Sequence, residues 1–438
     1  MDISRERRRE IIAALRKGTV PQRGLDFLAV GLTRFEPVIA SELGDVAQGG
    51  SMFKAVRGDY GCGKTFFGRW VQEYAKKKGF AAAEVQISET ETPLHRLETV
   101  YRRAMEQLST TDTFLGAFRS IIDGWFYGLE EDVLAEGTID PSDEKSLSRR
   151  ADELLEQRLA EITRATPQFA AALRAYRTAQ RANDHATAEG LAGWLAGQPH
   201  VAASVKREAG VKGDVDHYAA LSFLRGLLLI LKDTGYSGLV LVLDEIETLQ
   251  RVRGDVREKG LNALRQLIDD IDSGRFPNLY LLTTGTPAFF DGPQGVRRLE
   301  PLAQRLHVDF QTDPRFDNPR AVQLRLSAFD HDRLLEVGIK VRDLFAADCS
   351  SPDRVRRLAP DSYIELLARS VTGKLGGKGG IGPRLFLKKL VSDVLDRIDQ
   401  FDDFDPTKHY QLTIDRNEMT AVERESQPQS VDDIELGP

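Results

Sequence analysis

A glycine-rich stretch between an apolar run and an amphipathic segment most constrains the fold of this chain. It reads Gly58-Asp59-Tyr60-Gly61-Cys62-Gly63-Lys64-Thr65. The stretch fits G-x-x-x-x-G-K-[ST], a pattern whose glycines let backbone N–H groups turn inward around a phosphate. Residues 51–57 can form a strand, and apolar residues recur at helical spacing from Phe66 onward. Strand, loop and helix in this order predict a nucleotide phosphate site; a glycine-rich turn without a ligand is the alternative.

The residue types in this loop suggest individual roles. Lys64 would reach the β- and γ-phosphates of a nucleotide, and the Thr65 hydroxyl would hold Mg²⁺. The nucleotide-binding candidates are therefore Gly58, Asp59, Tyr60, Gly61, Cys62, Gly63, Lys64, Thr65 and the following Phe66.

Size and composition indicate a globular chain of two or three domains. Its 438 residues are 41% hydrophobic and 29% charged. No apolar run reaches the roughly 18 residues of a membrane helix, so we expect no membrane partner. The charged N-terminus shows no secretory signal, and Cys62 inside the loop argues against a disulfide; both fit the cytoplasm.

The formal net charge of −7 does not favour a protein that coats DNA. Two basic clusters, residues 5–9 and 76–78, could bind nucleic acid locally or form solvated helix faces. Both interpretations stay open at this point.

Two helices, over residues 3–17 and 34–46, precede the first strand. Gly18-Thr19-Val20-Pro21 ends the first helix. By analogy with nucleotide-binding folds of this shape, we place Val20 and Pro21 against adenine; a plain helix stop is the alternative.

A second strand is expected over residues 81–87, and residues 93–216 then show only helical patterns. The helices expected there are 94–108, 114–129, 153–162, 169–182 and 188–195. We interpret this region as a helical insertion, in which Trp125, Phe126, Tyr127 and Trp194 form either the core or a base-stacking platform.

A helix over 217–231 leads into a strand, 238–245, that contains five successive apolar residues and ends in Asp244-Glu245. Such a strand is buried on both faces, as in a parallel sheet. Carboxylates at the ends of parallel strands lie beside the ligand crevice. Asp244 would orient Mg²⁺ and Glu245 would polarise the attacking water, the Walker B pattern; a helix cap is the alternative.

The remaining pattern contains two more strands and a helical C-terminal part. A polar stretch over 251–259 leads into a helix over 261–271, and a strand over 279–286 ends in hydroxyls, of which Thr284 and then Thr286 could reach the γ-phosphate. Residues 299–310 predict a short helix running into a fifth strand, with Arg305 at the join. Helices over 333–345, 362–370 and 384–398 follow, with a glycine-rich loop at 373–382 and a polar, partly disordered tail beyond 411.

With these features in order, the chain resembles AAA+ P-loop ATPases of the initiator branch, the origin-recognition-like proteins, over about residues 20–90 and 220–400. It is more similar still to a bacterial family, the BrxD-like ATP-binding proteins of BREX phage-defence systems, at residues 18–21, at the phosphate loop and at Gly382-Pro383-Arg384. The resemblance implies ATP as ligand, Thr284 or Thr286 as sensor 1, Arg305 as arginine finger and Arg384 as sensor 2.

The chain departs from the initiator pattern in two respects. The insertion has no counterpart in simple AAA+ proteins, so its role is not implied by the resemblance. Too few residues follow position 398 to build the winged helix with which initiators bind DNA.

We therefore predict an α/β protein with a parallel sheet in the order 5-1-4-3-2. The domains expected are 1–50 (N-terminal helices), 51–310 (ATPase core with the insertion at 93–216), 311–410 (helical lid) and 411–438 (tail). The expected activity is Mg²⁺-dependent ATP binding and hydrolysis by a homo-oligomeric ring or filament that binds DNA weakly and acts with other defence proteins. A slow ATP-dependent assembly switch that recruits partners is the alternative; a signalling NTPase that oligomerises through the insertion is a third.

Overall fold

The computed structural model of this chain describes residues 3–137, 140, 143–374 and 383–414. The chain divides into two compact units. The first contains residues 1–38, 56–73 and 309–438, and the second contains residues 39–55 and 74–308. Of the predicted tail, residues 411–414 are described, and Leu412 is buried in the core of the first unit. The rest of the tail and most of the predicted glycine-rich loop, residues 375–382, lie outside the described residues.

Five strands form one parallel sheet in the order β2-β3-β4-β1-β5. They are β1 (Met52–Arg57), β2 (Phe80–Gln86), β3 (Gly238–Asp244), β4 (Leu279–Gly285) and β5 (Gln323–Arg325). This is the predicted order, which is confirmed. Every residue of β3 and β4 is buried, which explains why both strands are continuously apolar and do not alternate.

The predicted position of the fifth strand is wrong. Residues 307–310 form no strand, and their side chains alternate between exposed and half-buried. The strand is instead Gln323–Arg325, whose first two residues are buried. The short run His307-Val308-Asp309-Phe310 has the length of a strand, but it does not join the sheet. The Phe310 ring instead contacts two arginines, since the guanidinium groups of Arg57 and Arg325 stack on it.

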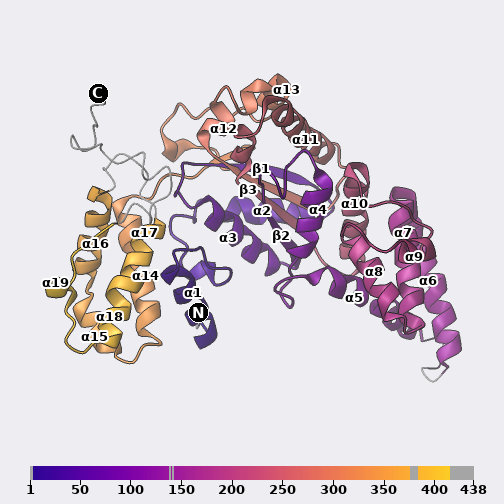
Figure 1. The fold of residues 1–438 in the computed structure, drawn as a ribbon, viewed down its shortest axis with the longest axis horizontal. Helices are drawn as coiled ribbons and strands as arrows, with labels where there is room; N and C mark the ends of the chain where they lie inside the picture. The colour runs from indigo at the N-terminus through magenta and orange to yellow at the C-terminus, as the bar shows by residue number, and fades with distance from the viewer. Residues whose placement is uncertain (1–2, 138–139, 141–142, 375–382, 415–438) are drawn as a thin grey trace, which may run out of the picture. The chain divides into compact units, whose positions relative to one another are not determined.

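The second unit carries the helical insertion that the sequence predicts. Its helices, with those that flank the central strands, are α2 (Glu36–Ala47), α4 (Leu97–Glu106), α5 (Ala117–Ala135), α6 (Glu144–Ala165), α7 (Pro167–Arg181), α8 (His185–Leu195), α9 (Ala203–Glu208), α10 (His217–Asp233), α11 (Gly254–Asp272), α12 (Pro287–Asp291) and α13 (Glu300–Arg305). Within the described part of residues 93–216 there is no strand, only one isolated bridge between Ala82 and Ser109. Helices α6, α7 and α8 lie side by side (Figure 1).

The aromatic residues of the insertion mostly form its core. Trp125, Phe126 and Trp194 are buried, and the Trp194 indole donates to the Gly213 carbonyl at 3.1 Å. The core interpretation is therefore confirmed for these three and wrong for Tyr127, which is 64% exposed. None of the helices in the described part of the chain combines the length and apolarity of a membrane-spanning segment.

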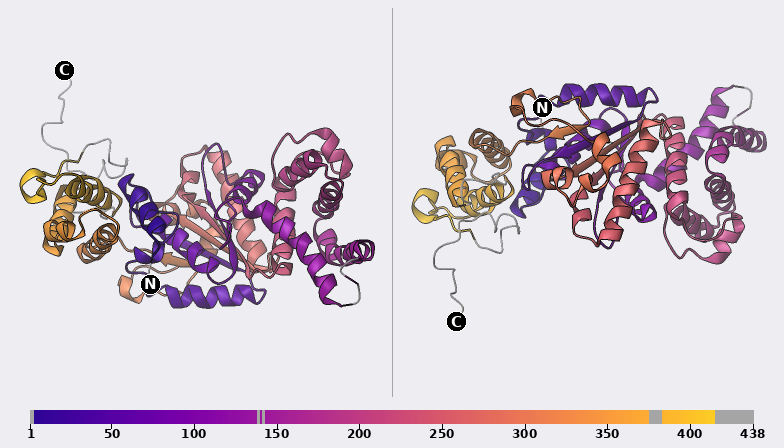
Figure 2. Two further views of the ribbon diagram at one scale, coloured as in Figure 1. Left: turned by 90° about the horizontal axis from the view of Figure 1, so that it is seen from below. Right: turned by 90° about the horizontal axis from the view of Figure 1, so that it is seen from above.

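The first unit contains α1 (Arg5–Arg16), most of α3 (Lys64–Lys76) and a C-terminal bundle, which both views of Figure 2 show as one group of helices. The bundle comprises α14 (His331–Ala346), α15 (Pro352–Leu358), α16 (Asp361–Lys374), α17 (Pro383–Lys388), a π-helical stretch (Lys389–Leu395), α18 (Asp396–Gln400) and α19 (Pro406–His409). The last predicted helix thus exists, begins at Pro383 as expected, and has wider π-type turns in its middle.

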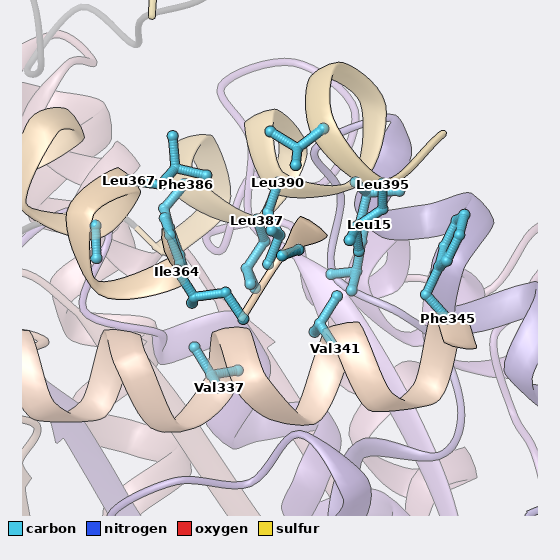
Figure 3. Packing of buried hydrophobic residues seen from close by; sticks show 14 of the residues in the cluster. Leu15, Val337, Val341, Phe345, Ile364, Leu367, Phe386, Leu387, Leu390 and Leu395 are labelled. Carbon is cyan, nitrogen blue, oxygen red and sulfur yellow. The ribbon is translucent and has the colours of Figure 1, made fainter. Parts of the chain in front are cut away.

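Helix α1 shares one hydrophobic core with the C-terminal bundle. Leu15 of α1 packs among Val341, Phe345, Leu387 and Leu395 (Figure 3). Ion pairs close the edges of this core, since Arg9 bonds Asp348 at 2.7 Å and Arg16 bonds Asp396 at 2.6 Å. These arginines of α1 therefore remain exposed, but their charges are paired with carboxylates of the same chain.

A buried ion pair fastens α2 to the sheet in the second unit. Lys54 of β1 is 1% exposed, and its ammonium lies 2.5 Å from the carboxylate of Glu42 in α2. The hydroxyl of Tyr280 in β4 donates to the same carboxylate at 2.8 Å, and burial raises the pKa of Tyr280 well above its ordinary value. One carboxylate therefore joins α2 both to β1, the next element in the chain, and to the distant β4.

We predict that Lys54→Met destabilises the protein by about 3–5 kcal/mol, because it leaves the Glu42 charge buried without its cation. Adding Glu42→Gln should recover part of the loss, since the amide is neutral and still accepts from Tyr280. Urea unfolding of both variants measures this. A Lys54→Met stability within about 0.5 kcal/mol of wild type would contradict the assignment.

Candidate nucleotide-binding site

The glycines of the predicted phosphate loop have the conformations that this loop requires. Gly61 and Gly63 have φ of 80° and 94°, in the left-handed region that side chains disfavour. A methyl group on Gly58 would lie 2.4 Å from Cys62 Sγ and 3.0 Å from the Leu326 carbonyl oxygen, so only glycine fits there. The backbone therefore turns as a phosphate-binding loop must.

Lys64 is the first residue of α3, and its side chain folds back over the loop. Its Nζ donates to the carbonyls of Gly58 at 2.9 Å and Asp59 at 3.2 Å, and lies 5.1 Å from the centre of the Tyr60 ring. Charged phosphate oxygens are better acceptors for an ammonium than neutral carbonyls are, and could replace them. The ammonium thus stands where the chemistry of the loop needs it, with Thr65 next to it.

The other loop residues divide into exposed and packed ones. Asp59 and Tyr60 are exposed, whereas Cys62 is buried, and burial raises the pKa of its thiol to about 11. The thiol is therefore neutral and adds no negative charge near bound phosphate. Phe66 packs against the core of α1 and the C-terminal bundle.

The predicted adenine segment lies in the same unit as the loop. The Val20 carbonyl accepts from Arg69 Nη1 of α3 at 2.9 Å, and Pro21 is buried. A methyl group on Gly18 would lie 3.7 Å from Arg384 Nη1. The structure therefore brings the Gly18–Pro21 segment, the helix that follows the loop and the predicted sensor-2 arginine together.

The predicted acidic pair forms a compact polar group in the second unit. Strand register sets Gln86 of β2 opposite Asp244. The Thr284 hydroxyl donates to Asp244 Oδ1 and accepts from the Glu245 N–H at 3.2 Å, while Gln86 Nε2 donates to Glu245 Oε2 at 2.9 Å. Three neighbouring strands thus hold the pair.

The backbone of Glu245 is strained. Its φ of 59° and ψ of 42° place a non-glycine residue in the left-handed region, at a cost of order 1–3 kcal/mol. Glu245 occupies the cap position of a 3-10 turn (Ile246–Gln250), but its side chain makes no capping bond there. A helix-cap role therefore does not explain this residue, and its carboxylate is exposed and directed by Gln86.

The two candidate threonines have different surroundings. Thr284 contacts Asp244 and Glu245, as described above. The Thr286 side chain accepts from the Phe289 N–H at 3.4 Å and so caps the start of α12. The structure thus brings only Thr284 to the acidic pair.

Arg305 ends α13, as predicted, and is held by its own unit. It forms an ion pair with Asp269 of α11, and its Nη1 donates to the Pro301 carbonyl at 2.9 Å. Asp269 also pairs with Arg265 at 3.0 Å. Asp269 therefore pairs with two arginines, and it would keep Arg265 as a partner if Arg305 moved away.

Three polar residues with clear contacts escaped the sequence analysis: Gln86, Arg69 and Glu73. Gln86 ends β2 and could have been found by the argument that selected Asp244, since both close parallel strands at one edge. Arg69 and Glu73 follow Thr65 at intervals of four residues, which places all three on one side of α3.

The oxygen donors available suit Mg²⁺. The Thr65 hydroxyl and the Asp244 carboxylate are hard ligands, and Mg²⁺ is usually bound by one or two protein groups together with phosphates and water. Among the described residues no group of three or more His, Cys, Asp or Glu side chains could hold a metal by itself.

Comparison with known proteins places the chain in a family. No curated protein and no solved structure matches the chain significantly. A family model described as BREX system ATP-binding protein BrxC/D matches residues 3–414. The match covers both units, the loop, the acidic pair and the C-terminal bundle. The chain belongs to the BREX system ATP-binding protein BrxC/D family.

Proposed function

We propose that this chain hydrolyses ATP with Mg²⁺ as an AAA+ ATPase of a BREX phage-defence system. The loop and the acidic pair each follow the carboxyl end of a strand of one parallel sheet, which is where α/β proteins bind nucleotides. Lys64 would neutralise phosphate charge, Thr65 and Asp244 would hold Mg²⁺, and Glu245 would align the attacking water. The observation that carries the proposal is the strained, exposed Glu245 beside Asp244 and Thr284.

A slow ATP-dependent switch that recruits partner defence proteins is the second candidate. The hydrogen bond from Gln86 to the Glu245 carboxylate favours it, because a carboxylate that already accepts a bond is a weaker partner for water. Turnover separates the two candidates. A DNA-stimulated rate well above about 1 s⁻¹ suits a motor or loader, whereas tight ATP retention suits a switch.

We predict that Glu245→Gln keeps ATP affinity and lowers turnover by about 10²-fold or more, because the amide keeps the shape but cannot accept a proton from water. Lys64→Ala should lose ATP binding itself. Binding titrations and single-turnover hydrolysis measure both effects, with Glu161→Gln, an exposed glutamate of α6, as matched control. Wild-type turnover by Glu245→Gln would reject this residue as the one that orients water.

Arg305 is proposed to act on the ATP of a neighbouring copy. It must then leave Asp269, whose charge Arg265 continues to balance. Arg305→Ala should be inactive alone, since a finger in trans contributes about 10³-fold to the rate. Lys64→Ala should be inactive alone because it does not bind ATP. Mixed, they should recover activity, because one supplies the site and the other the finger. If mixing restores nothing while sedimentation shows assembly, Arg305 is structural.

We also propose weak, sequence-independent DNA binding that grows with assembly. Of the basic residues after the acidic pair, Arg251, Arg253 and Lys259 are exposed. Arg257 instead donates to backbone carbonyls, including those of Gln250 and Val252, both at 2.9 Å. Arg257 therefore stabilises the turn over residues 249–252 and is not available to phosphates.

The double variant Arg251→Ala/Arg253→Ala should lower the slope of log affinity against log salt by about 2, since each phosphate contact contributes about 0.9. Fluorescence anisotropy with a labelled duplex measures this slope. The matched control is Lys145→Ala/Arg149→Ala, two exposed residues of α6. An unchanged slope in the test variant, or tight sequence-specific binding by a monomer, would contradict the proposal.

A further inference from the structure

Helix α3 presents a row of three polar side chains that begins at the nucleotide site. Thr65, Arg69 and Glu73 are spaced by four residues, so they lie along one side of the helix. Thr65 closes the phosphate loop. The other two side chains continue the row and contact the segment of residues 20–25, nearly fifty positions earlier in the chain.

These contacts are made to backbone groups of the segment. Arg69 Nη1 donates to the Val20 carbonyl at 2.9 Å. The two oxygens of the Glu73 carboxylate accept from the N–H groups of Gly24 at 2.9 Å and Leu25 at 2.7 Å. Bonds to backbone fix the path of the chain whatever side chains it carries, and bonds from charged groups are the stronger class.

The segment is shaped to receive the Glu73 carboxylate. Gly24 has φ of 76°, and a methyl group there would lie 2.8 Å from Ile11 Cδ1. Leu25 begins a 3-10 turn, η1 (Leu25–Phe27), whose first N–H groups have no acceptor within the turn. Glu73 supplies that acceptor, and its side chain is only 14% exposed.

The other side of the segment faces the C-terminal bundle. A methyl group on Gly18 would lie 3.4 Å from the Lys388 side chain and 3.7 Å from Arg384 Nη1, both in α17. Residues 18–25 are therefore held by α3 through hydrogen bonds and lie against α17. Their distance from the phosphate loop is set by α3, a single rigid element.

We propose that Arg69 and Glu73 are positioning residues for the nucleotide base. They fix the backbone around Val20 and Pro21 at a set distance from Lys64 and Thr65, so that base and triphosphate are bound together. The inference rests on the proposed function, ATP binding, and on the prediction from the sequence that Val20 and Pro21 contact adenine. Without the two side chains, the segment would have to be ordered by ATP itself, which weakens binding.

The test compares a ligand that has a base with one that has none. Arg69→Ala and Glu73→Ala should each bind ATP about tenfold more weakly, as expected for loss of a hydrogen bond to a charged group. Both should bind Mg²⁺-tripolyphosphate as wild type does, because the phosphate loop is untouched. Arg69→Lys should restore most of the ATP affinity, since an ammonium can still donate to the Val20 carbonyl. Calorimetric titration measures all affinities.

The matched control is Asp348→Asn, which removes a partly buried carboxylate that also anchors the N-terminal region, through Arg5 and Arg9. It should change neither affinity. Equal losses for ATP and tripolyphosphate in the Arg69 and Glu73 variants, or no loss for either ligand, would overturn the inference. A wild-type chain that binds no ATP would refute the proposed function, and this is seen before any substitution is made.

Discussion

The pairing of β3 with β2 on one side and β4 on the other is the constraint on which the acidic half of the site depends. The register sets Gln86 of β2 opposite Asp244, and on the other side of β3 it lets Thr284 of β4 bond Asp244. All three positions close buried parallel strands, so a slip by one residue would turn the whole polar group into the hydrophobic interior. The apolar composition of β3 and β4 therefore does more than build a core: it fixes where the carboxylates emerge.

Sequence reasoning succeeded where the deciding residues are neighbours in the chain. The glycine-rich loop and the first four strands follow from local patterns and lie where predicted, and the strand order follows from the resemblance and is confirmed. It failed at the fifth strand, because His307-Val308-Asp309-Phe310 and Gln323-Leu324-Arg325 are both short and only packing decides between them. The choice between Thr284 and Thr286 likewise depended on a distant residue, because Thr284 bonds Asp244 whereas Thr286 caps α12 through the nearby Phe289 N–H.

The number of basic residues in the sequence overstates the positive charge that the protein surface presents to a polyanion such as DNA. Arg5 and Arg9 pair with Asp348, Arg16 pairs with Asp396, and Arg257 is bonded to carbonyls of its own loop. The excess of acidic over basic residues, with a net charge of −7, means that a basic side chain readily finds a carboxylate within the chain. An arginine or lysine whose charge is balanced by a neighbouring carboxylate contributes little to the long-range attraction of a polyanion.

Helix α1 and the C-terminal bundle share one core, although most of the chain lies between them in sequence. Two segments of the backbone therefore connect this core to the rest of the protein. One is the segment after α1, bonded to α3 by Arg69 and Glu73. The other follows β5, where the Leu326 N–H donates to the Arg57 carbonyl at 2.8 Å, just before the phosphate loop. Both segments are thus bonded to residues just before or after the phosphate loop, so the loop, α1 and the bundle belong to one compact unit although the chain leaves that unit between them.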